Sequence, residues 1–286
     1  MPMASVAIYL SFVKVSHTVF ALPFALTGAL LAWRTQPFEW RQVVWILVAM
    51  VAARSAAMGF NRLVDARFDA LNPRTANREL PRGAMRTGEA VAFVVVAAAV
   101  FVSAAFQLGP VCGWLSPVAL VIVGWYSLAK RYTAYTQLFL GLAMAVAPVG
   151  GWLAAGGQSG WEPWLLALAI GLWVGGFDIL YACQDVDFDR AQGLRSIPER
   201  FGVSRSIALS RVMHAATVLV MAALQWAAGL PGAYFAGVAV VALLLTYEQS
   251  LVSAGDLSQV KRAFDLNGWV GIAYFACTAA SLWLAS

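Results

Sequence analysis

The sequence has very little charge for its length. Of its 286 residues only 12% are charged, whereas 61% are hydrophobic, and the mean hydropathy is +0.74. A soluble globular domain carries about 25% charged and about 45–50% apolar residues. So few polar groups cannot cover a water-soluble surface, which excludes a soluble enzyme, a coiled coil and a disordered chain. The composition predicts an integral membrane protein.

Cysteine is scarce as well. The three cysteines, Cys112, Cys183 and Cys277, are far apart and have neither CxxC nor Cys/His ligand spacing, so they indicate core residues and no disulfide framework. No positive charge precedes Lys14 and no small-residue cleavage pattern follows it, so we expect no cleaved signal peptide.

What the sequence has in abundance is long apolar runs. They lack the polar/apolar alternation of barrel strands, and because lipid admits only helices or closed barrels, they predict an all-α, multi-pass fold. A span needs about 20 residues. Charged or Pro/Gly-containing breaks delimit nine segments: 15–33, 42–60, 88–108, 110–129, 134–153, 163–183, 206–227, 232–251 and 266–284. We expect a single membrane-embedded domain over 1–286.

The basic residues predict the orientation of these spans. With the N-terminus inside, sixteen of the nineteen Lys and Arg residues fall in inner loops or at inner helix ends. The outer loops hold only Arg34 and Arg41, and Arg54 lies within the second segment. This asymmetry predicts nine spans with the N-terminus inside and the C-terminus outside.

Six of the fourteen acidic residues gather in two short stretches at inner helix ends. The first reads Asn61-x3-Asp65-x3-Asp69, and the second contains Asp178, Tyr181, Asp185, Asp187 and Asp189. Spacing of four places such groups on one helix face, about one turn apart. Close carboxylates repel each other unless a cation lies between them, and oxygen ligands at this density suit Mg²⁺. The stretches at 61–69 and 181–189 form a weak internal repeat, 120 residues apart.

Arginines and a proline follow both stretches. They are Arg74, Arg78, Pro81 and Arg82 after the first, and Arg190, Arg195 and Pro198 after the second. Metal ions and guanidinium groups together suit a bound diphosphate. Alternatively, the acids only pair with these loop arginines at a wet helix end. Arg54 lies two turns before Asn61 on the same face, where it would bind either an anion or a partner within the bundle.

At these residues the sequence resembles the UbiA superfamily of intramembrane prenyltransferases. The matching strings are KVSHTVFALPFAL (14–26), RSAAMGFNRLVDARFD (54–69), NPRTANRELPRG (72–83), YSLAKRYT (126–133) and YACQDVDFD (181–189). Within this superfamily the chain is most similar to 4-hydroxybenzoate polyprenyltransferases. QDVDFD with LRSIPERFG (194–202) also resembles the subgroup that acts on 1,4-dihydroxy-6-naphthoate in the futalosine route to menaquinone.

The resemblance implies nine helices around a central cavity, with a lateral opening for the lipid tail. It implies that Mg²⁺ is bound by Asn61, Asp65, Asp69, Asp185 and Asp189, of which the four aspartates are catalytic. It also implies that Arg67, Arg78, Lys130 and Arg131 contact the diphosphate. Tyr126 and Tyr181 are candidates to face the carbocation, and Arg54 to anchor the acceptor carboxylate or the diphosphate.

The expected function is Mg²⁺-dependent transfer of a polyprenyl group from its diphosphate to a small aromatic acid, in ubiquinone or menaquinone biosynthesis. The expected setting is the bilayer of a bacterial-type inner membrane, with the site on the cytoplasmic side and no nucleic-acid or obligate protein partner. Two alternatives remain. Membrane acids and a repeat are typical of transporters, but here they lie at helix ends. A CDP-alcohol phosphotransferase would carry Asp-Gly and Gly-x3-Asp-x3-Asp, where this chain has Asn61.

Overall fold

The computed structural model describes residues 6–13 and 21–285. Lys14, His17 and residues 15–20 of the first expected segment lie outside these ranges. Within them the chain contains no β-strand, only an isolated bridge between Ser253 and Asp256, which confirms the all-α prediction.

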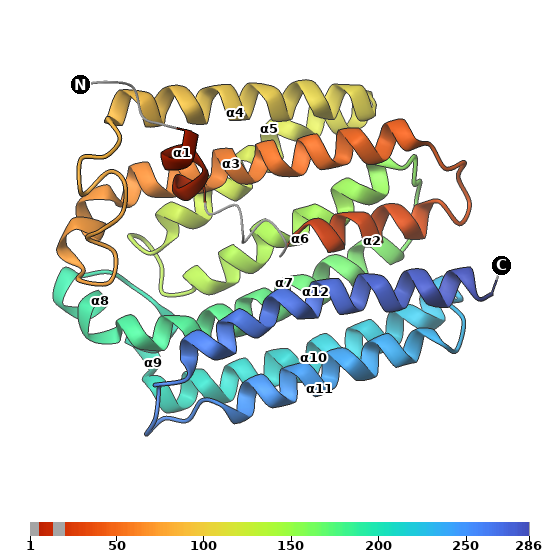
Figure 1. The fold of residues 1–286 in the computed structure, drawn as a ribbon. Coiled ribbons are helices and arrows are strands. Elements are labelled where there is room, and N and C mark those ends of the chain that lie inside the picture. Colours follow the sequence, from red (N-terminus) through yellow and green to blue (C-terminus); the bar gives the residue numbers. More distant parts are fainter. Residues whose placement is uncertain (1–5, 14–20, 286) are drawn as a thin grey trace.

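Each predicted apolar segment coincides with a helix in the described residues (Figure 1). These helices are α2 (Leu22–Ala32), α3 (Trp40–Leu71), α4 (Thr87–Leu108), α5 (Pro110–Ala129), α6 (Thr136–Ala154), α7 (Glu162–Ala182), α10 (Val203–Ala228), α11 (Tyr234–Ser250) and α12 (Val260–Trp283). Short elements are α1 (Val6–Phe12), η2 (Cys183–Asp185), α8 (Val186–Gln192) and α9 (Ile197–Phe201).

Within residues 6–13 and 21–285, six stretches are long and apolar enough to cross a bilayer: α3, α4, α5, α6, α10 and the run Glu162–Gln192. α2 and α11 are apolar but shorter. The protein is therefore an integral membrane protein, while the count of nine spans and their orientation stay predictions.

The helices pack around α7, which is the most buried of the six candidate spans. α7 lies between α6 and α10, α2 packs on α6 and α12, and α3 packs on α4. At the centre, the ring of Trp173 contacts Phe24 of α2 at 5.0 Å between centroids, and its Nε1 donates to Asn267 Oδ1 of α12 at 2.7 Å. Buried aromatic contacts and a satisfied indole N–H thus join three helices.

α3 continues eleven residues beyond the apolar segment predicted for it. The extension carries Asn61, Asp65 and Asp69 past the apolar part of the bundle, and the helix ends at Leu71, just before Asn72-Pro73. The residue that precedes a proline is disfavoured in the α conformation, which accounts for this end. One long helix therefore holds the whole first motif rigidly.

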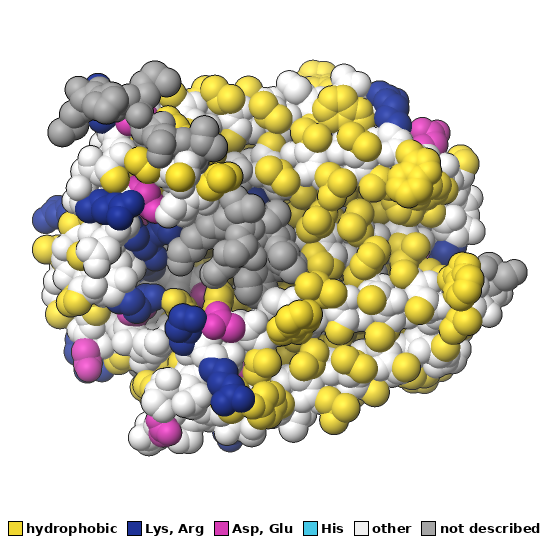
Figure 2. Space-filling model, viewed as in Figure 1, with side chains coloured by type: hydrophobic (Ala, Val, Ile, Leu, Met, Phe, Trp, Pro, Cys, Tyr) yellow, Lys and Arg dark blue, Asp and Glu magenta, His cyan; other side chains and the backbone are white. Residues whose placement is uncertain are grey.

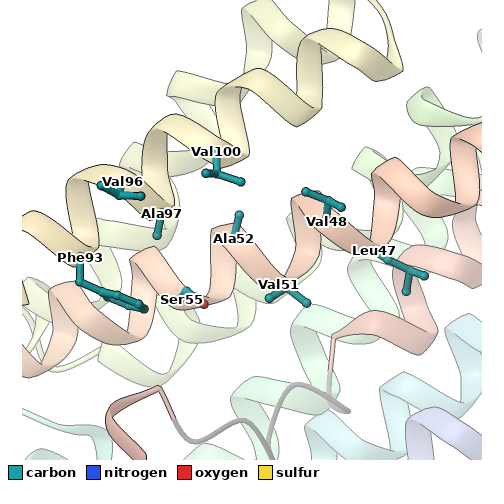
Figure 3. Close-up of a pocket in the computed structure, with 9 residues that line it drawn as sticks. All are labelled: Leu47, Val48, Val51, Ala52, Ser55, Phe93, Val96, Ala97 and Val100. Carbon is teal, nitrogen blue, oxygen red and sulfur yellow. The ribbon is translucent and has the colours of Figure 1, made fainter. Parts of the chain in front are cut away.

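The outside of the bundle is apolar over most of its length. Figure 2 shows hydrophobic side chains covering the surface away from the end that carries most of the charged groups. Trp114, Val121 and Leu243 are among the exposed ones, at 75%, 70% and 71%. Between α3 and α4 lies an apolar hollow of about 430 Å³, lined by residues such as Val51, Phe93 and Val100 (Figure 3). A surface of this kind suits lipid.

Candidate active site

The polar end of the bundle gathers three connections that are distant in sequence. The loop 72–86, α8 and α9, and the joint between α5 and α6 lie together at this end (Figure 1). They enclose a cavity of about 260 Å³, lined from α3, α5, α6, α7 and α8 by polar and apolar side chains. Both aspartate motifs open into this cavity, so the two stretches singled out by the sequence form one site.

Asp65 and Asp69 of α3 are buried, with exposures of 4% and 6%. Asp65 accepts from Asn61 Nδ2 at 3.2 Å, and its two oxygens pair with Lys130 Nζ and Arg131 Nη2, each at 3.0 Å. Asp69 pairs with Arg78, whose Nη1 lies 2.6 Å and 2.7 Å from the two carboxylate oxygens. Every motif position on α3 therefore faces the cavity.

The second motif is bound to the loop that follows the first. Arg74 donates from Nη2 to Asp185 Oδ2 at 2.5 Å and from Nη1 to Tyr181 Oη at 2.6 Å, and its guanidinium lies 5.1 Å from the centroid of the Tyr181 ring. Asp189 also lines the cavity and interacts with the Ser196 side chain. Arg74 thus connects the two halves of the site.

Lys130 and Arg131 reach the cavity from the end of α5. The backbone carbonyl of Lys130 accepts from Arg195 N at 2.8 Å, so the segment after the second motif fixes this helix end. Both cationic groups also lie over the ring of Phe68, at 5.8 Å and 5.4 Å from its centroid. A ring face stabilises a cation beside it, so Phe68 supports both side chains.

Arg54 lies deeper in the bundle than the aspartates. Its Nε is buried and has no hydrogen-bond partner among the described residues. Tyr126, which lines the cavity, interacts electrostatically with Arg54, Asp65 and Asp178. An unpaired buried guanidinium N–H is costly, so this position suits an anion that enters from the cavity.

Arg54, which lies deeper in the bundle, and Arg67 are expected site residues that do not line the cavity. Arg67 is exposed, because two residues after Asp65 the helix has turned by about 200°. Asp187 is likewise fully exposed and lies 3.8 Å from Arg190. Arg74, in contrast, lines the cavity, although the sequence pattern marks it only as an arginine of the NPRTANRELPRG loop that resembles the family.

The donor set fits Mg²⁺. Within the described ranges no three carboxylate, imidazole or thiolate groups already form a cage, because Asp65, Asp69 and Asp185 each face a basic side chain. Mg²⁺ does not require such a cage, since it binds through one or two carboxylates together with waters and substrate phosphates. The buried carboxylate oxygens would bind the metal, and the Lys and Arg groups beside them would bind the substrate phosphates.

Comparison with known proteins agrees with this geometry and defines the class: the chain is an intramembrane prenyltransferase. It belongs to the UbiA prenyltransferase family, whose model matches residues 21–283. A 4-hydroxybenzoate octaprenyltransferase of Salmonella paratyphi C is 31% identical over 84% of each chain. One from Citrobacter koseri is 32% identical over 83% of each chain. A transporter is thereby set aside.

Solved structures show the same fold. A UbiA homologue from Aeropyrum pernix, described in its apo form, aligns with a TM-score of 0.86 and 36% identity, over 94% of this chain and 98% of that one. A homologue from Archaeoglobus fulgidus, described as bound to GPP and Mg²⁺, aligns with a TM-score of 0.74 and 20% identity, over 95% and 99%.

Proposed function

We propose that the enzyme transfers a polyprenyl group from polyprenyl diphosphate to a small aromatic acid such as 4-hydroxybenzoate, with Mg²⁺ bound at the two motifs. One observation carries the proposal: both aspartate motifs and four basic side chains open into one cavity, with Arg54 deeper in the bundle. The curated relatives act on 4-hydroxybenzoate, and a structural neighbour binds GPP and Mg²⁺.

The residues divide into two groups by depth. Asp65, Asp69, Asp185 and Asp189, with Asn61, would hold the metal, which when bound neutralises the diphosphate leaving group. Arg74, Arg78, Lys130 and Arg131 would then bind phosphate oxygens, and stabilise the charge that develops as the allylic C–O bond breaks. Tyr126 and Tyr181 line the cavity in which the cation would form, where an aromatic ring can stabilise it.

The acceptor occupies the deeper part of the cavity. Its carboxylate would bind the unpaired Arg54 guanidinium, which directs the phenol ring toward the aspartates. The ring carbon ortho to the hydroxyl then attacks the allylic carbon. The apolar helices around the cavity exclude water, which would otherwise capture the cation.

The exposed apolar surface of the bundle would hold the protein in a bacterial inner membrane, with the charged end and its cavity on the cytoplasmic side. That orientation follows the distribution of Lys and Arg. A second candidate acceptor is 1,4-dihydroxy-6-naphthoate, favoured by the resemblance of QDVDFD and LRSIPERFG to the subgroup that acts on it.

The test is a parallel assay in proteoliposomes with Mg²⁺. One labelled polyprenyl diphosphate is offered with 4-hydroxybenzoate or with 1,4-dihydroxy-6-naphthoate. Asp65→Asn and Asp185→Asn should each lower kcat/KM by about 100-fold or more, because each removes a charge that the transition state requires. Chelation with EDTA should act likewise. Asp187→Asn is the matched control and should retain activity. Full activity in both motif variants would contradict the metal assignment.

A further inference from the structure

Asp178 is an acidic residue of the cavity that lies outside both motifs. It is on α7, one turn before Tyr181 and seven residues before Asp185, so it lies about 10 Å from Asp185 along the helix axis. This displacement runs toward the interior of the bundle, the same direction in which Arg54 precedes Asn61 on α3. Asp178 is therefore on the acceptor side of the metal motifs.

Asp178 differs from the motif aspartates in having no partner. Asp65, Asp69 and Asp185 each form an ion pair, whereas no described residue donates a hydrogen bond to Asp178 or pairs with it. The groups that act on it through space are Asp185 on η2, Tyr126 on α5 and Lys130 just after α5. A carboxylate that faces a cavity without a donor is free to accept one from a ligand.

Tyr126 locates Asp178 relative to the proposed acceptor. Tyr126, Asp65 and Asp178 line the same cavity, and the charges of Arg54, Asp65 and Asp178 all act on the Tyr126 hydroxyl, so Asp178 and Arg54 lie around one tyrosine. A phenol ring whose carboxylate is bound by Arg54 would extend from Arg54 toward Asp65. Such a ring would pass beside the Asp178 carboxylate.

We infer that Asp178 is the base that removes the ring proton, an inference that rests on the proposed function. As the new C–C bond forms ortho to the phenol, the allylic C–O bond breaks and its electron pair stays on the diphosphate. The substituted ring carbon then still carries its hydrogen. The Asp178 carboxylate takes that proton, and the C–H electron pair restores the aromatic ring. Asp178 becomes a carboxylic acid and returns the proton to water when the product leaves.

The released diphosphate is a weaker candidate for this role. It would be held at the aspartate motifs by Lys130, Arg131, Arg74 and Arg78, and the motif residue Asp185 lies seven residues, about two helical turns, beyond Asp178. Cations bound to phosphate oxygens lower their basicity. A base must also be within hydrogen-bond reach of the proton that it removes.

The experiment compares Asp178→Asn with the wild type in proteoliposomes, using 4-hydroxybenzoate deuterated at both positions ortho to the hydroxyl. Loss of the base should lower kcat by about 100- to 10,000-fold. It should also raise the isotope effect on kcat above the wild-type value, because proton loss becomes rate-limiting. Asp178→Glu should recover part of kcat, and formate should partly restore Asp178→Ala. Asp187→Asn is the control, with the wild-type isotope effect.

Each outcome decides the inference. An unchanged isotope effect in Asp178→Asn, or no rescue of Asp178→Ala by formate, overturns it. If Asp178→Asn weakens Mg²⁺-dependent binding of geranyl diphosphate and leaves kcat intact, Asp178 belongs to the donor site, and the inference is wrong. If the wild type prenylates neither acceptor, the proposed function fails and the inference with it. An active wild type with an unchanged Asp178→Asn refutes only the role of Asp178.

Discussion

Arg54 is a charged side chain that the bundle holds in its interior. Its Nε is buried without a partner, whereas Arg41 on the same helix is exposed and donates to Gln107 Oε1 at 3.0 Å. Burial of an unpaired N–H of a charged group is unfavourable unless a ligand supplies the missing acceptor. An acceptor carboxylate meets this need, because a guanidinium binds it through two parallel hydrogen bonds.

We therefore expect Arg54→Gln to raise the KM for 4-hydroxybenzoate by roughly 10- to 100-fold, which corresponds to about 1.5–3 kcal/mol for charged hydrogen bonds. The measurement is prenyl transfer at saturating donor. A phenol acceptor without a carboxylate should show a much smaller change, and Arg41→Gln should leave both values unaffected. An equal rise for both acceptors would refute the anchor role.

Among the helices, glycine residues determine how closely α2 and α6 approach each other. Where α2 and α6 cross, Gly28 of α2 faces the backbone of Pro148 in α6, and Gly151 of α6 faces the backbone of Ala25 in α2. A Cβ added to Gly151 would lie 1.9 Å from the carbonyl oxygen of Ala25, and one added to Gly28 would lie 2.1 Å from that of Pro148. Neither backbone can move away without separating the helices. The adjacent Gly150 has open space beside it.

Gly151→Ala should consequently destabilise the protein by about 1–3 kcal/mol, because the added methyl group overpacks a backbone contact. Gly150→Ala should be neutral or stabilise it by up to about 1 kcal/mol, since alanine is the better helix former. Thermal unfolding in detergent measures both. A midpoint for Gly151→Ala at or above that of Gly150→Ala would contradict the close approach.

The sequence predicted the helices well, because they depend on local pattern. Apolar runs delimited the spans, and spacing of four placed Asp65 and Asp69 on one face. The same rule applied to Arg67 would have excluded it, since a residue two positions on lies on the other side. What local pattern could not show was pairing between distant segments. The contact of Arg74 with Asp185, or of Trp173 with Asn267, depends on how helices pack.

At the scale of the whole molecule, the charges are concentrated at one end of an apolar bundle. The joint between α6 and α7 and the last residues of α12 lie at the end opposite α8 (Figure 1). Ser159 in that joint and Gln192 in α8 are both exposed. If the charged end faces the cytoplasm, the two positions lie on different sides of the membrane.

Single-cysteine variants test this arrangement. With Cys112, Cys183 and Cys277 replaced by Ala, Ser159→Cys should react in intact cells with a membrane-impermeant maleimide. Gln192→Cys should react only after the membrane is permeabilised. The reasons are the distribution of basic residues and the cost of moving charged loops outward. The cysteine-free protein serves as the control, and the reverse labelling pattern would overturn the proposed orientation.

The ion pairs of the cavity have a thermodynamic consequence for the proposed reaction. A divalent cation that arrives alone must displace Lys130, Arg131, Arg78 or Arg74 from an aspartate. A diphosphate that arrives alone must draw the same side chains away from the same carboxylates. When the two arrive together, they exchange partners with the protein and leave no charge unmatched. Each ligand should then lower the apparent dissociation constant of the other by an equal factor, so the protein selects the metal–diphosphate pair over either component.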